Sequence, residues 1–269
     1  MRFDSPKWNR ARIWEVLSLL GAAIERVELK VTVPDTDHSS AIAAFEMDVL
    51  DAELRQVVFF DTPDLALNRH GLAVRARRIR KGGDVVVKLR PVVPASLPGK
   101  LRRSPDFTIE VDVTPEAFVC SCSLKSRADN ADVKCVLDGQ RPLRKLLQPA
   151  QRALFVEHAP QGLDLDSLLA FGPITVAKLK VSPQELAGRT VTAELWLLPD
   201  GSRILELSTK CRCADAYQVA GEIRTFVTHR GVNLTGQQET KTRRALKYFA
   251  HLYAHGGQPR RTRRRERDR

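Results

Sequence analysis

Several short motifs that assign function in other proteins are missing from this sequence. It has neither a Gly-x-x-x-x-Gly-Lys-Ser/Thr loop nor a Gly-x-Gly-x-x-Gly turn, which argues against the nucleotide-binding folds that hold phosphates with those loops. It also lacks the Gly-x-Ser-x-Gly motif of serine hydrolases. The six histidines show no His-Glu-x-x-His or comparable spacing, so we assign none of them a role.

Long hydrophobic runs are absent as well. The apolar stretch at residues 16–24 is short, and Glu15 and Glu25 bound it on both sides. A membrane-spanning helix needs about 20 apolar residues, and no convincing signal cleavage site follows this stretch. We therefore expect a cytoplasmic protein with no membrane partner.

Cysteine is scarce, and its arrangement fits the same compartment. The five cysteines include Cys120-Ser-Cys122 and Cys211-Arg-Cys213, whose spacing differs from the Cys-x-x-Cys knuckle of many zinc sites. A zinc site built from these two pairs and Cys135 stays open as an alternative. The odd number of cysteines favours reduced structural thiols.

Positive charge exceeds negative charge, with 44 Lys and Arg against 32 Asp and Glu and a formal net charge of +12. Residues 260–269 hold seven arginines against Glu266 and Asp268, so this tail contributes +5 and the rest of the chain +7. Such an excess favours anionic partners. We expect residues 254–269 to form a solvated, disordered basic arm, and nucleic acid or polyphosphate is its candidate partner.

Charged residues recur two positions apart inside segments that otherwise have the composition of β-strands. Side chains at i and i+2 of a strand point to the same face, so each such pair lines one face and the apolar residues between them line the other. The pattern fits a sheet with one wet face. Acidic and basic pairs lie on separate strands, however, and the strands are too many for one small sheet, which favours a closed barrel with a charged lumen. The pairs two positions apart are Glu28 and Lys30, Arg75 and Arg77, Lys88 and Arg90, Glu110 and Asp112, and Lys178 and Lys180. Glu206 and Lys210 lie four positions apart and so share a face as well.

The expected fold is of the α+β class, an eight-stranded antiparallel β-barrel with flanking helices. Turn residues at Gly82-Gly83 and at Pro199-Asp200-Gly201 predict two hairpins. Strands are predicted at residues 27–33, 54–60, 72–79, 84–90, 107–113, 174–181, 190–198 and 202–210. Helices are predicted within residues 1–25, which carry an amphipathic stripe, and at residues 41–47, 141–147, 215–230 and 240–253. Residues 116–150 are otherwise ambiguous.

A lumen lined by Lys and Arg suits a ligand whose negative charge is spread over several phosphoryl groups. Carboxylates in the same space would repel that ligand unless a cation lay between them. Five of them are therefore candidate ligands of Mg²⁺ or Mn²⁺, which prefer oxygen donors: Glu28, Glu110, Asp112, Glu194 and Glu206. For any single pair, cross-strand ion pairing remains the simpler interpretation.

Six segments, in this order, resemble the CYTH superfamily, also called triphosphate tunnel metalloenzymes. Residues 26–30 (Arg-Val-Glu-Leu-Lys) are similar to the family's opening Glu-x-Glu-x-Lys. Residues 59–67 (Phe-Phe-Asp-Thr-Pro-Asp-Leu-Ala-Leu) are similar to its Tyr-Phe-Asp-Thr-Pro-Asp-x-x-Leu stretch. Further matches are a basic hairpin at residues 71–77 and 87–90, an acidic strand at 110–112, a Glu-Leu-x-x-Lys strand at 206–210 and a closing segment at 240–243.

The resemblance implies an eight-stranded tunnel, at residues 26–253, that binds a triphosphate-containing small molecule on basic side chains. It implies Mg²⁺ or Mn²⁺ held by acidic residues, here Glu28, Glu110, Asp112 and Glu206, to which the residue pattern adds Glu194. Glu28 and Lys30 would be catalytic. The phosphate-binding residues carried over are Lys30, Arg75, Arg77, Lys88, Arg90, Lys180, Lys210 and Lys241, with Arg152 matched to a family arginine on the fifth strand.

Two departures from the family pattern bear on catalysis. Arg26 stands where the first signature glutamate is expected, and Ser208 stands where the later acidic strand often repeats Glu. A cation at a metal-ligand position removes an oxygen donor and repels the ion. Metal-dependent hydrolysis of inorganic, thiamine or nucleoside triphosphate is the first hypothesis. The alternatives are a non-catalytic CYTH protein that binds polyphosphate, nucleotide or RNA, and a class IV-type adenylate cyclase.

Overall fold

The computed structural model describes residues 26–115, 118–234, 239–257 and 260–261. The helix predicted within residues 1–25 lies outside these ranges, as does most of the predicted arm at residues 254–269. Within the described ranges, no helix is both long and apolar enough to cross a membrane.

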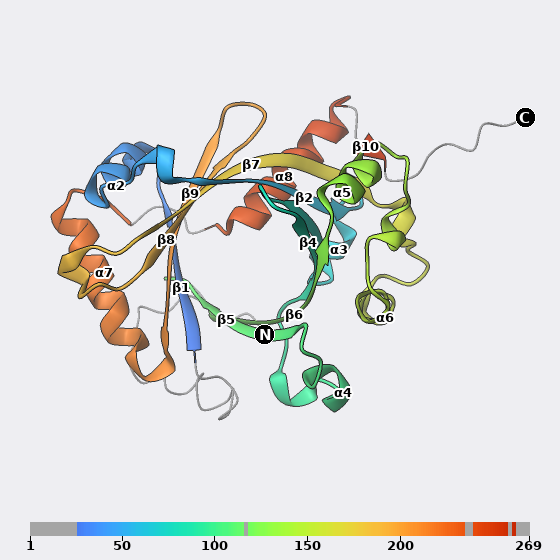
Figure 1. The fold of residues 1–269 in the computed structure, drawn as a ribbon, viewed down its shortest axis with the longest axis horizontal. Helices are drawn as coiled ribbons and strands as arrows, with labels where there is room; N and C mark the ends of the chain where they lie inside the picture. The colour runs from blue at the N-terminus through green and yellow to red at the C-terminus, as the bar shows by residue number, and fades with distance from the viewer. Residues whose placement is uncertain (1–25, 116–117, 235–238, 258–259, 262–269) are drawn as a thin grey trace, which may run out of the picture.

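Nine strands of the described chain close into a barrel (Figure 1). Neighbouring strands follow the order β7-β2-β3-β4-β6-β5-β1-β9-β8, and pairing of β8 with β7 completes the ring. A two-residue strand, β10 (Arg260–Arg261), extends β7 outside the ring. The nine strands are β1 (Arg26–Val33), β2 (Glu53–Asp61), β3 (Leu72–Arg78), β4 (Gly83–Leu89), β5 (Phe107–Val113), β6 (Phe118–Ala128), β7 (Leu169–Val181), β8 (Val191–Leu197) and β9 (Arg203–Arg212).

The prediction of eight antiparallel strands was wrong in two respects. β6 was not expected, and β1 pairs with β5 in parallel, whereas the other described pairs of the ring are antiparallel. The inner face of β6 carries Ser121 and Ser123, which lie opposite Glu110 and Lys88. Lys125 and Arg127 follow on the same face, two positions apart, and the Lys125 ammonium lies 3.6 Å from Asp84. The charge spacing of the other strands is thus present on β6 as well, but it was not recognised within residues 116–150. With β6 inserted between β4 and β5, β5 runs in the same direction as β1, and the two strands pair in parallel.

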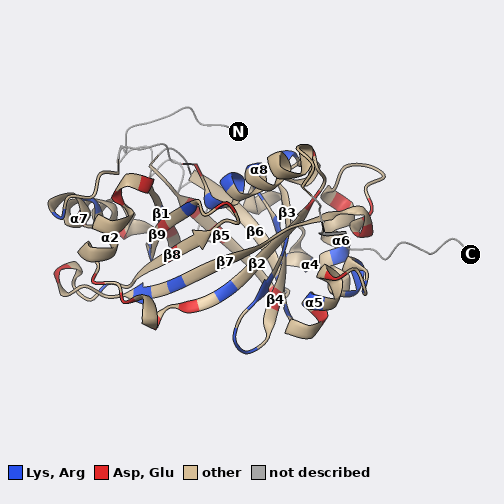
Figure 2. Cartoon of the chain, turned by 90° about the horizontal axis from the view of Figure 1, so that it is seen from above, with Lys and Arg blue, Asp and Glu red and all other residues tan. Residues whose placement is uncertain are grey.

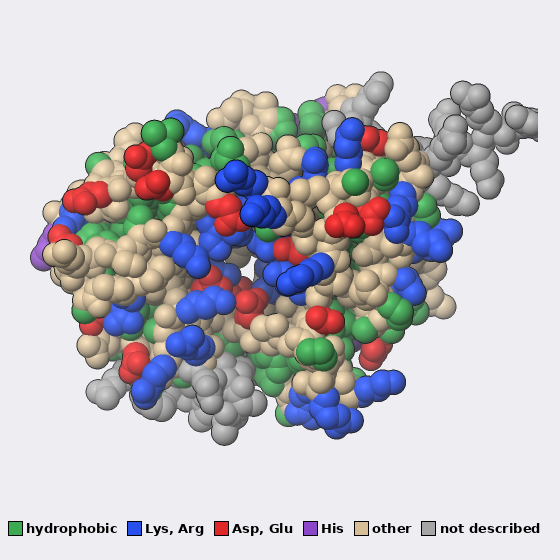
Figure 3. All heavy atoms as spheres, in the orientation of Figure 1, with side chains coloured by type: hydrophobic (Ala, Val, Ile, Leu, Met, Phe, Trp, Pro, Cys, Tyr) green, Lys and Arg blue, Asp and Glu red, His purple; other side chains and the backbone are tan. Residues whose placement is uncertain are grey.

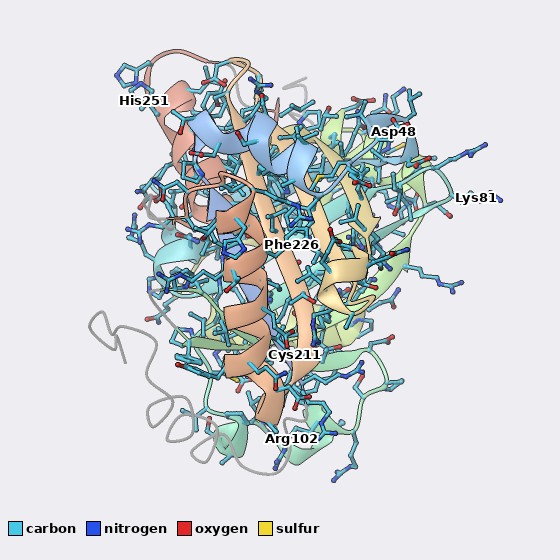
Figure 4. The ribbon with its side chains drawn as sticks, turned by 90° about the vertical axis from the view of Figure 1, so that its left-hand side faces the viewer. Asp48, Lys81, Arg102, Cys211, Phe226 and His251 are labelled. Carbon is cyan, nitrogen blue, oxygen red and sulfur yellow. The ribbon has the colours of Figure 1, made fainter. Side chains whose placement is uncertain are left out.

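Helices cover two outer sides of the barrel (Figure 1). α2 (His38–Ala44) and α7 (Ala216–His229) pack on one side, where the Phe226 ring lies 4.9 Å from that of Phe45 (Figure 4). α5 (Asn130–Leu137) and α6 (Pro149–His158) pack on the other side. The remaining helical segments are α3 (Ala66–Arg69), α4 (Gly99–Arg102), η1 (Asp35–Asp37), η2 (Val49–Asp51), η3 (Pro94–Ser96), η4 (Leu143–Lys145), η5 (Leu165–Ser167), η6 (Gln184–Leu186) and η7 (Cys213–Asp215).

One more helix, α8 (Lys241–Ala254), packs against apolar residues on the inner face of the barrel. Its residues Ala245, Leu246 and Phe249 join a cluster that includes Trp196 and Ile204. Those two residues are register partners and lie on the same strand faces as Glu194 and Glu206. One part of the barrel interior is therefore apolar and closed by α8, while the rest carries charge.

The helix predictions were met unevenly. The helices expected at residues 41–47, 215–230 and 240–253 correspond to α2, α7 and α8. The helix expected at residues 141–147 is a single turn, η4, and α6 follows it. Pro149 at the first helical position and reciprocal bonds between Gln148 and Gln151 start α6, which the sequence interpretation had not assigned.

Candidate functional site

The register of the strands brings the predicted charged pairs onto one continuous inner surface. Glu28 on β1 is the direct partner of Lys210 on β9 and of Asp112 on β5. Glu194 on β8 is the partner of Glu206 on β9 and of Lys178 on β7. Figure 2 shows charged positions recurring along the strands, and Figure 3 shows a central opening bordered by Lys, Arg, Asp and Glu side chains. The barrel interior is the candidate site.

On one wall of the lumen, two lysines hold three carboxylates. The Lys30 ammonium lies 2.8 Å from Asp112 and 3.3 Å from Glu28, and the Lys88 ammonium lies 3.1 Å from Glu110 and 3.9 Å from Asp112. Burial acts to lower the pKa of Lys30, but the nearby carboxylates outweigh it and raise that pKa. The Lys210 ammonium also lies 3.7 Å from Glu110, so three lysines face three carboxylates and their charges balance on this wall.

A second pair of carboxylates is held by a lysine that does not belong to the barrel. Lys241, the first residue of α8, places its ammonium 2.5 Å from Glu194 and 2.7 Å from Glu206. Burial acts to raise the pKa of Glu194, but the Lys241 charge and hydrogen bonds from Lys241 and Trp196 lower it to about 2. Glu194 is therefore ionised at neutral pH.

The cations of β3, β4 and β7 are less well paired. Arg77 forms an ion pair with Asp84, whereas Arg75 comes no closer than 4.0 Å to that carboxylate. The side chains of Arg90, Lys178 and Lys180 have no carboxylate within 4.0 Å among the described residues. This part of the lumen carries positive charge that close ion pairs do not neutralise, although Asp112 and Glu206 act on Arg90, and Glu194 on Lys178, from farther away.

Burial in the barrel lowers the pKa values of several of these cations. Burial lowers the pKa of Arg75 and of Arg90, and burial together with the neighbouring Arg55 charge lowers that of Lys178. A buried charge without a partner is unfavourable. An anion entering the lumen would remove that cost.

A close backbone contact fixes where Arg90 leaves β4. The Arg90 amide donates to the Gly71 carbonyl at 2.8 Å, and Gly71 has a φ of +73°. A Cβ at this glycine would lie 2.2 Å from the Arg90 carbonyl oxygen. Glycine at position 71 is thus required both by its backbone conformation and by the approach of the arginine.

No protein-family model matches this sequence, and no curated protein sequence matches it either. Solved structures do match its fold. A crystal structure from Bacillus halodurans, provisionally named an adenylate cyclase, aligns with a TM-score of 0.54 at 12% identity, over 82% of this chain and 96% of that one. The Hippeastrum protein HpAC1, provisionally named an adenylyl cyclase and described as having a dominant triphosphatase activity, aligns with a TM-score of 0.56 at 14% identity, over 87% of this chain and 97% of that one.

This chain has a CYTH-type triphosphate tunnel fold. The predicted resemblance is confirmed at the level of the fold.

Arg152 is a predicted site residue that the structure does not bring to the lumen. It lies on α6, outside the barrel, and its guanidinium donates to the Leu147 carbonyl at 2.6 Å. Its assignment to a strand of the tunnel was wrong, because the proline and capping residues before it start a helix. The other predicted site residues lie on inner strand faces, except Arg90, which directly follows β4, and Lys241, which reaches the lumen from α8.

The segment at residues 59–67, which matched the family best, has a structural role in this tunnel. The Asp61 carboxylate accepts hydrogen bonds from the amides of Thr62, Leu67 and Asn68 at 2.8, 2.9 and 3.0 Å. It holds the turn between β2 and α3. The segment therefore supports the fold, and its Phe59 joins the apolar cluster of the barrel interior that α8 closes.

Some lumen residues were missed in the list of predicted sites. Lys178 was recognised as half of a charged pair but not assigned to phosphate, and Asp84 and Arg55 were not singled out. Asp84 contacts both Arg75 and Arg77, and Arg55 pairs with Glu53. The signal for Arg55 and Glu53 was present, since they alternate on β2 as the other pairs do.

The donor set of the tunnel does not fit a divalent metal ion as it is arranged. Among the described residues, no group of three or more His, Cys, Asp or Glu is placed to hold one. Carboxylate oxygens suit Mg²⁺ or Mn²⁺ chemically, but Lys30, Lys88 and Lys241 already contact the five candidates. The five cysteines are free, and burial raises the pKa of Cys120 and Cys211 to about 11, which fits structural thiols.

A cavity of about 650 Å³ lies outside the lumen, between α7 and the outer faces of β1 and β9. Leu29, Val31, Tyr217 and Ile223 are among its lining residues, and most of its surface is apolar. An apolar cavity does not suit a phosphate. The charged lumen remains the candidate site.

Proposed function

We propose that this protein binds a triphosphate-bearing small molecule inside the tunnel, through the phosphoryl oxygens of the ligand. The observation that carries the proposal is a set of lumen cations with no carboxylate closer than 4.0 Å in the described chain: Arg75, Arg90 and Lys178, which are partly buried, and Lys180, which is exposed. Three linked phosphoryl groups spread several negative charges over a length that one phosphate does not reach. Arg supplies forked donors to phosphate oxygens, and Lys supplies a compact charge.

The carboxylates of the opposite wall set the limits of this ligand. Glu110 and Asp112 are held by Lys88 and Lys30, and neither lies within 4.0 Å of Arg90 or Lys178, although the charge of Asp112 acts on Arg90 from farther away. They repel phosphoryl groups that move beyond the cations. We therefore expect the ligand to lie toward β3, β4 and β7, with its charged chain along the lumen.

Hydrolysis of the bound triphosphate is the second candidate function. Two observations favour it: Glu28, Glu110 and Asp112 line the same lumen, where a carboxylate could orient a water for in-line attack, and the Hippeastrum protein of similar fold has a dominant triphosphatase activity. The adenylate cyclase alternative has no feature of the lumen that we can assign to adenine recognition, and a shared fold does not decide between these activities.

Calorimetric titration of the full-length protein with inorganic triphosphate, in EDTA, tests the first proposal. We expect one site per chain, weaker for diphosphate and weakest for monophosphate. Absence of heat with all three ligands in both EDTA and Mg²⁺ would contradict it.

The hydrolysis proposal is tested by measuring phosphate release from inorganic triphosphate, thiamine triphosphate and ATP, each with Mg²⁺, Mn²⁺ or EDTA. Release that survives Glu28→Gln would remove Glu28 from the catalytic assignment.

A further inference from the structure

Two lumen carboxylates face each other directly across adjacent strands. Glu194 and Glu206 are register partners of β8 and β9, and their side chains are 18% and 6% exposed. Like charges at directly opposed positions destabilise a sheet, and the effect is larger where water is scarce. A cation must therefore lie between them.

Lys241 supplies that cation. Its ammonium contacts Glu194 at 2.5 Å and Glu206 at 2.7 Å, so one group bridges both carboxylates. A divalent ion held by oxygen donors would be the common way to join such a pair. An ammonium group has three donors and no acceptor, and it fills the same place.

The position of Lys241 is set by the helix that carries it. α8 begins at this residue, and the Thr240 hydroxyl accepts from the Arg243 amide at 3.4 Å as its cap. The apolar face of α8 packs on Trp196, whose ring centre lies 5.4 Å from the Lys241 ammonium. Trp196 also donates to Glu194 at 3.3 Å. Trp196 therefore contacts both Lys241 and Glu194 and helps to hold the two together.

We propose that Lys241 is a built-in cation that takes the place of a divalent metal ion between Glu194 and Glu206. It makes triphosphate binding in the lumen independent of metal, a consequence that rests on the proposed function. Lys30 is arranged in the same way between Glu28 and Asp112 on the neighbouring strands β1 and β5. The chain thus uses lysines at both carboxylate pairs.

The test removes the ammonium and looks for a metal in its place. Mn²⁺ is titrated into the full-length protein, and free Mn²⁺ is followed by its electron paramagnetic resonance signal. Lys241→Gln should gain one Mn²⁺ site that binds more than about tenfold more tightly than any site of the wild type, because a repelling charge is lost and two carboxylates are freed. Adding Glu206→Gln to this variant should remove the new site.

Two further variants keep the result interpretable. Lys247→Gln lies on the same helix and removes an ammonium that pairs with Glu239 at the surface, so its Mn²⁺ binding should match the wild type. Lys241→Arg restores a cation and should also match the wild type, provided that it folds as its thermal melt shows. A wild-type protein that binds Mn²⁺ tightly at a site removed by Glu206→Gln would overturn the proposal.

Triphosphate titrations separate this inference from the proposed function. The wild type should bind inorganic triphosphate equally in EDTA and in Mn²⁺, and Lys241→Gln should bind it better with Mn²⁺ than in EDTA. If neither protein binds triphosphate but Lys241→Gln gains the Mn²⁺ site, the proposed function fails while the role of Lys241 stands. If triphosphate binds and no Mn²⁺ site appears in Lys241→Gln, the role of Lys241 fails alone.

Discussion

Glu28 and Asp112 are register partners across the parallel strand pair β1–β5, and the ammonium of Lys30 lies between their carboxylates. This relationship exists because β6 separates β4 from β5 and so lets β5 run beside β1 in the same direction. The parallel pairing therefore places a signature residue of the first strand next to the acidic strand, and it decides which charges meet in the lumen.

Replacing Asp112 by asparagine should lower the free energy of unfolding at pH 7 by about 3 kcal/mol, because the buried ammonium of Lys30 loses a partner. Burial acts to raise the pKa of Asp112, but the charges of Lys30 and Lys88 lower it below its ordinary value. Such a group stabilises the fold above its unfolded pKa, and that contribution is lost as the pH falls through the lower folded pKa.

Urea denaturation at several pH values measures this effect. The difference between wild type and Asp112→Asn should be large at pH 7 and should shrink below a pH of about 4. Asp64→Asn is the matched control, since Asp64 forms an exposed ion pair with Arg69, and its loss should cost no more than about 0.5 kcal/mol. Equal losses for the two variants would contradict the electrostatic account.

The unneutralised cations should matter for binding more than for stability. Arg90→Ala and Lys178→Ala should each weaken inorganic triphosphate binding by roughly 10- to 100-fold, the worth of a hydrogen bond to a charged group. Their melting temperatures should fall little or rise, because neither cation has a carboxylate within 4.0 Å in the described chain. Calorimetry and thermal melts give both quantities.

Arg152→Ala is the control for these two variants. The structure places Arg152 on α6, outside the lumen, where it donates to the Leu147 carbonyl. Triphosphate affinity should therefore stay at the wild-type value. A loss of affinity as large as that of Arg90→Ala would instead support the prediction that Arg152 binds phosphate.

Much of the barrel could be predicted because its charged residues keep an even spacing along each strand. The pairs Glu28 with Lys30 and Glu110 with Asp112 repeat every second position, which is the period of a strand, and both line the lumen. The same spacing is present on β6 at Lys125 and Arg127, but the uncharged Ser121 and Ser123 precede them on that face, and the strand was not predicted.

The partners inside the lumen could not be predicted from local pattern. Lys241 meets Glu194 and Glu206 because α8 folds back onto the barrel interior, and this contact joins residues far apart in the sequence. Arg152 shows the opposite case, in which capping residues before it start a helix where a family match had suggested a strand. Spacing within a segment carries no information on either arrangement.

The arginine-rich end of the chain should contribute to nucleic acid binding through charge alone. Removing residues 256–269 takes away a net +5. In a salt titration of single-stranded RNA binding, the slope of log K against log salt should become shallower by about 0.7 for each arginine–phosphate contact that is lost. An unchanged slope would show that RNA binds another surface of the protein. As a control, the full-length and shortened proteins should bind triphosphate in the lumen equally well.

Gly71→Ala should couple stability to ligand binding. The alanine Cβ would meet the Arg90 carbonyl at 2.2 Å and would also adopt a φ of +73°, so the free energy of unfolding should fall by about 1–3 kcal/mol or more. Because Arg90 must move to relieve the contact, triphosphate affinity should fall as well.

Gly201→Ala is the matched control, since Gly201 has a φ of +85° but nothing within 4 Å of its Cβ position. It should lose stability through backbone strain alone and keep the wild-type affinity. Both variants strain the backbone, but only Gly71→Ala disturbs Arg90. If the two variants bind triphosphate equally well, Arg90 does not contact the ligand.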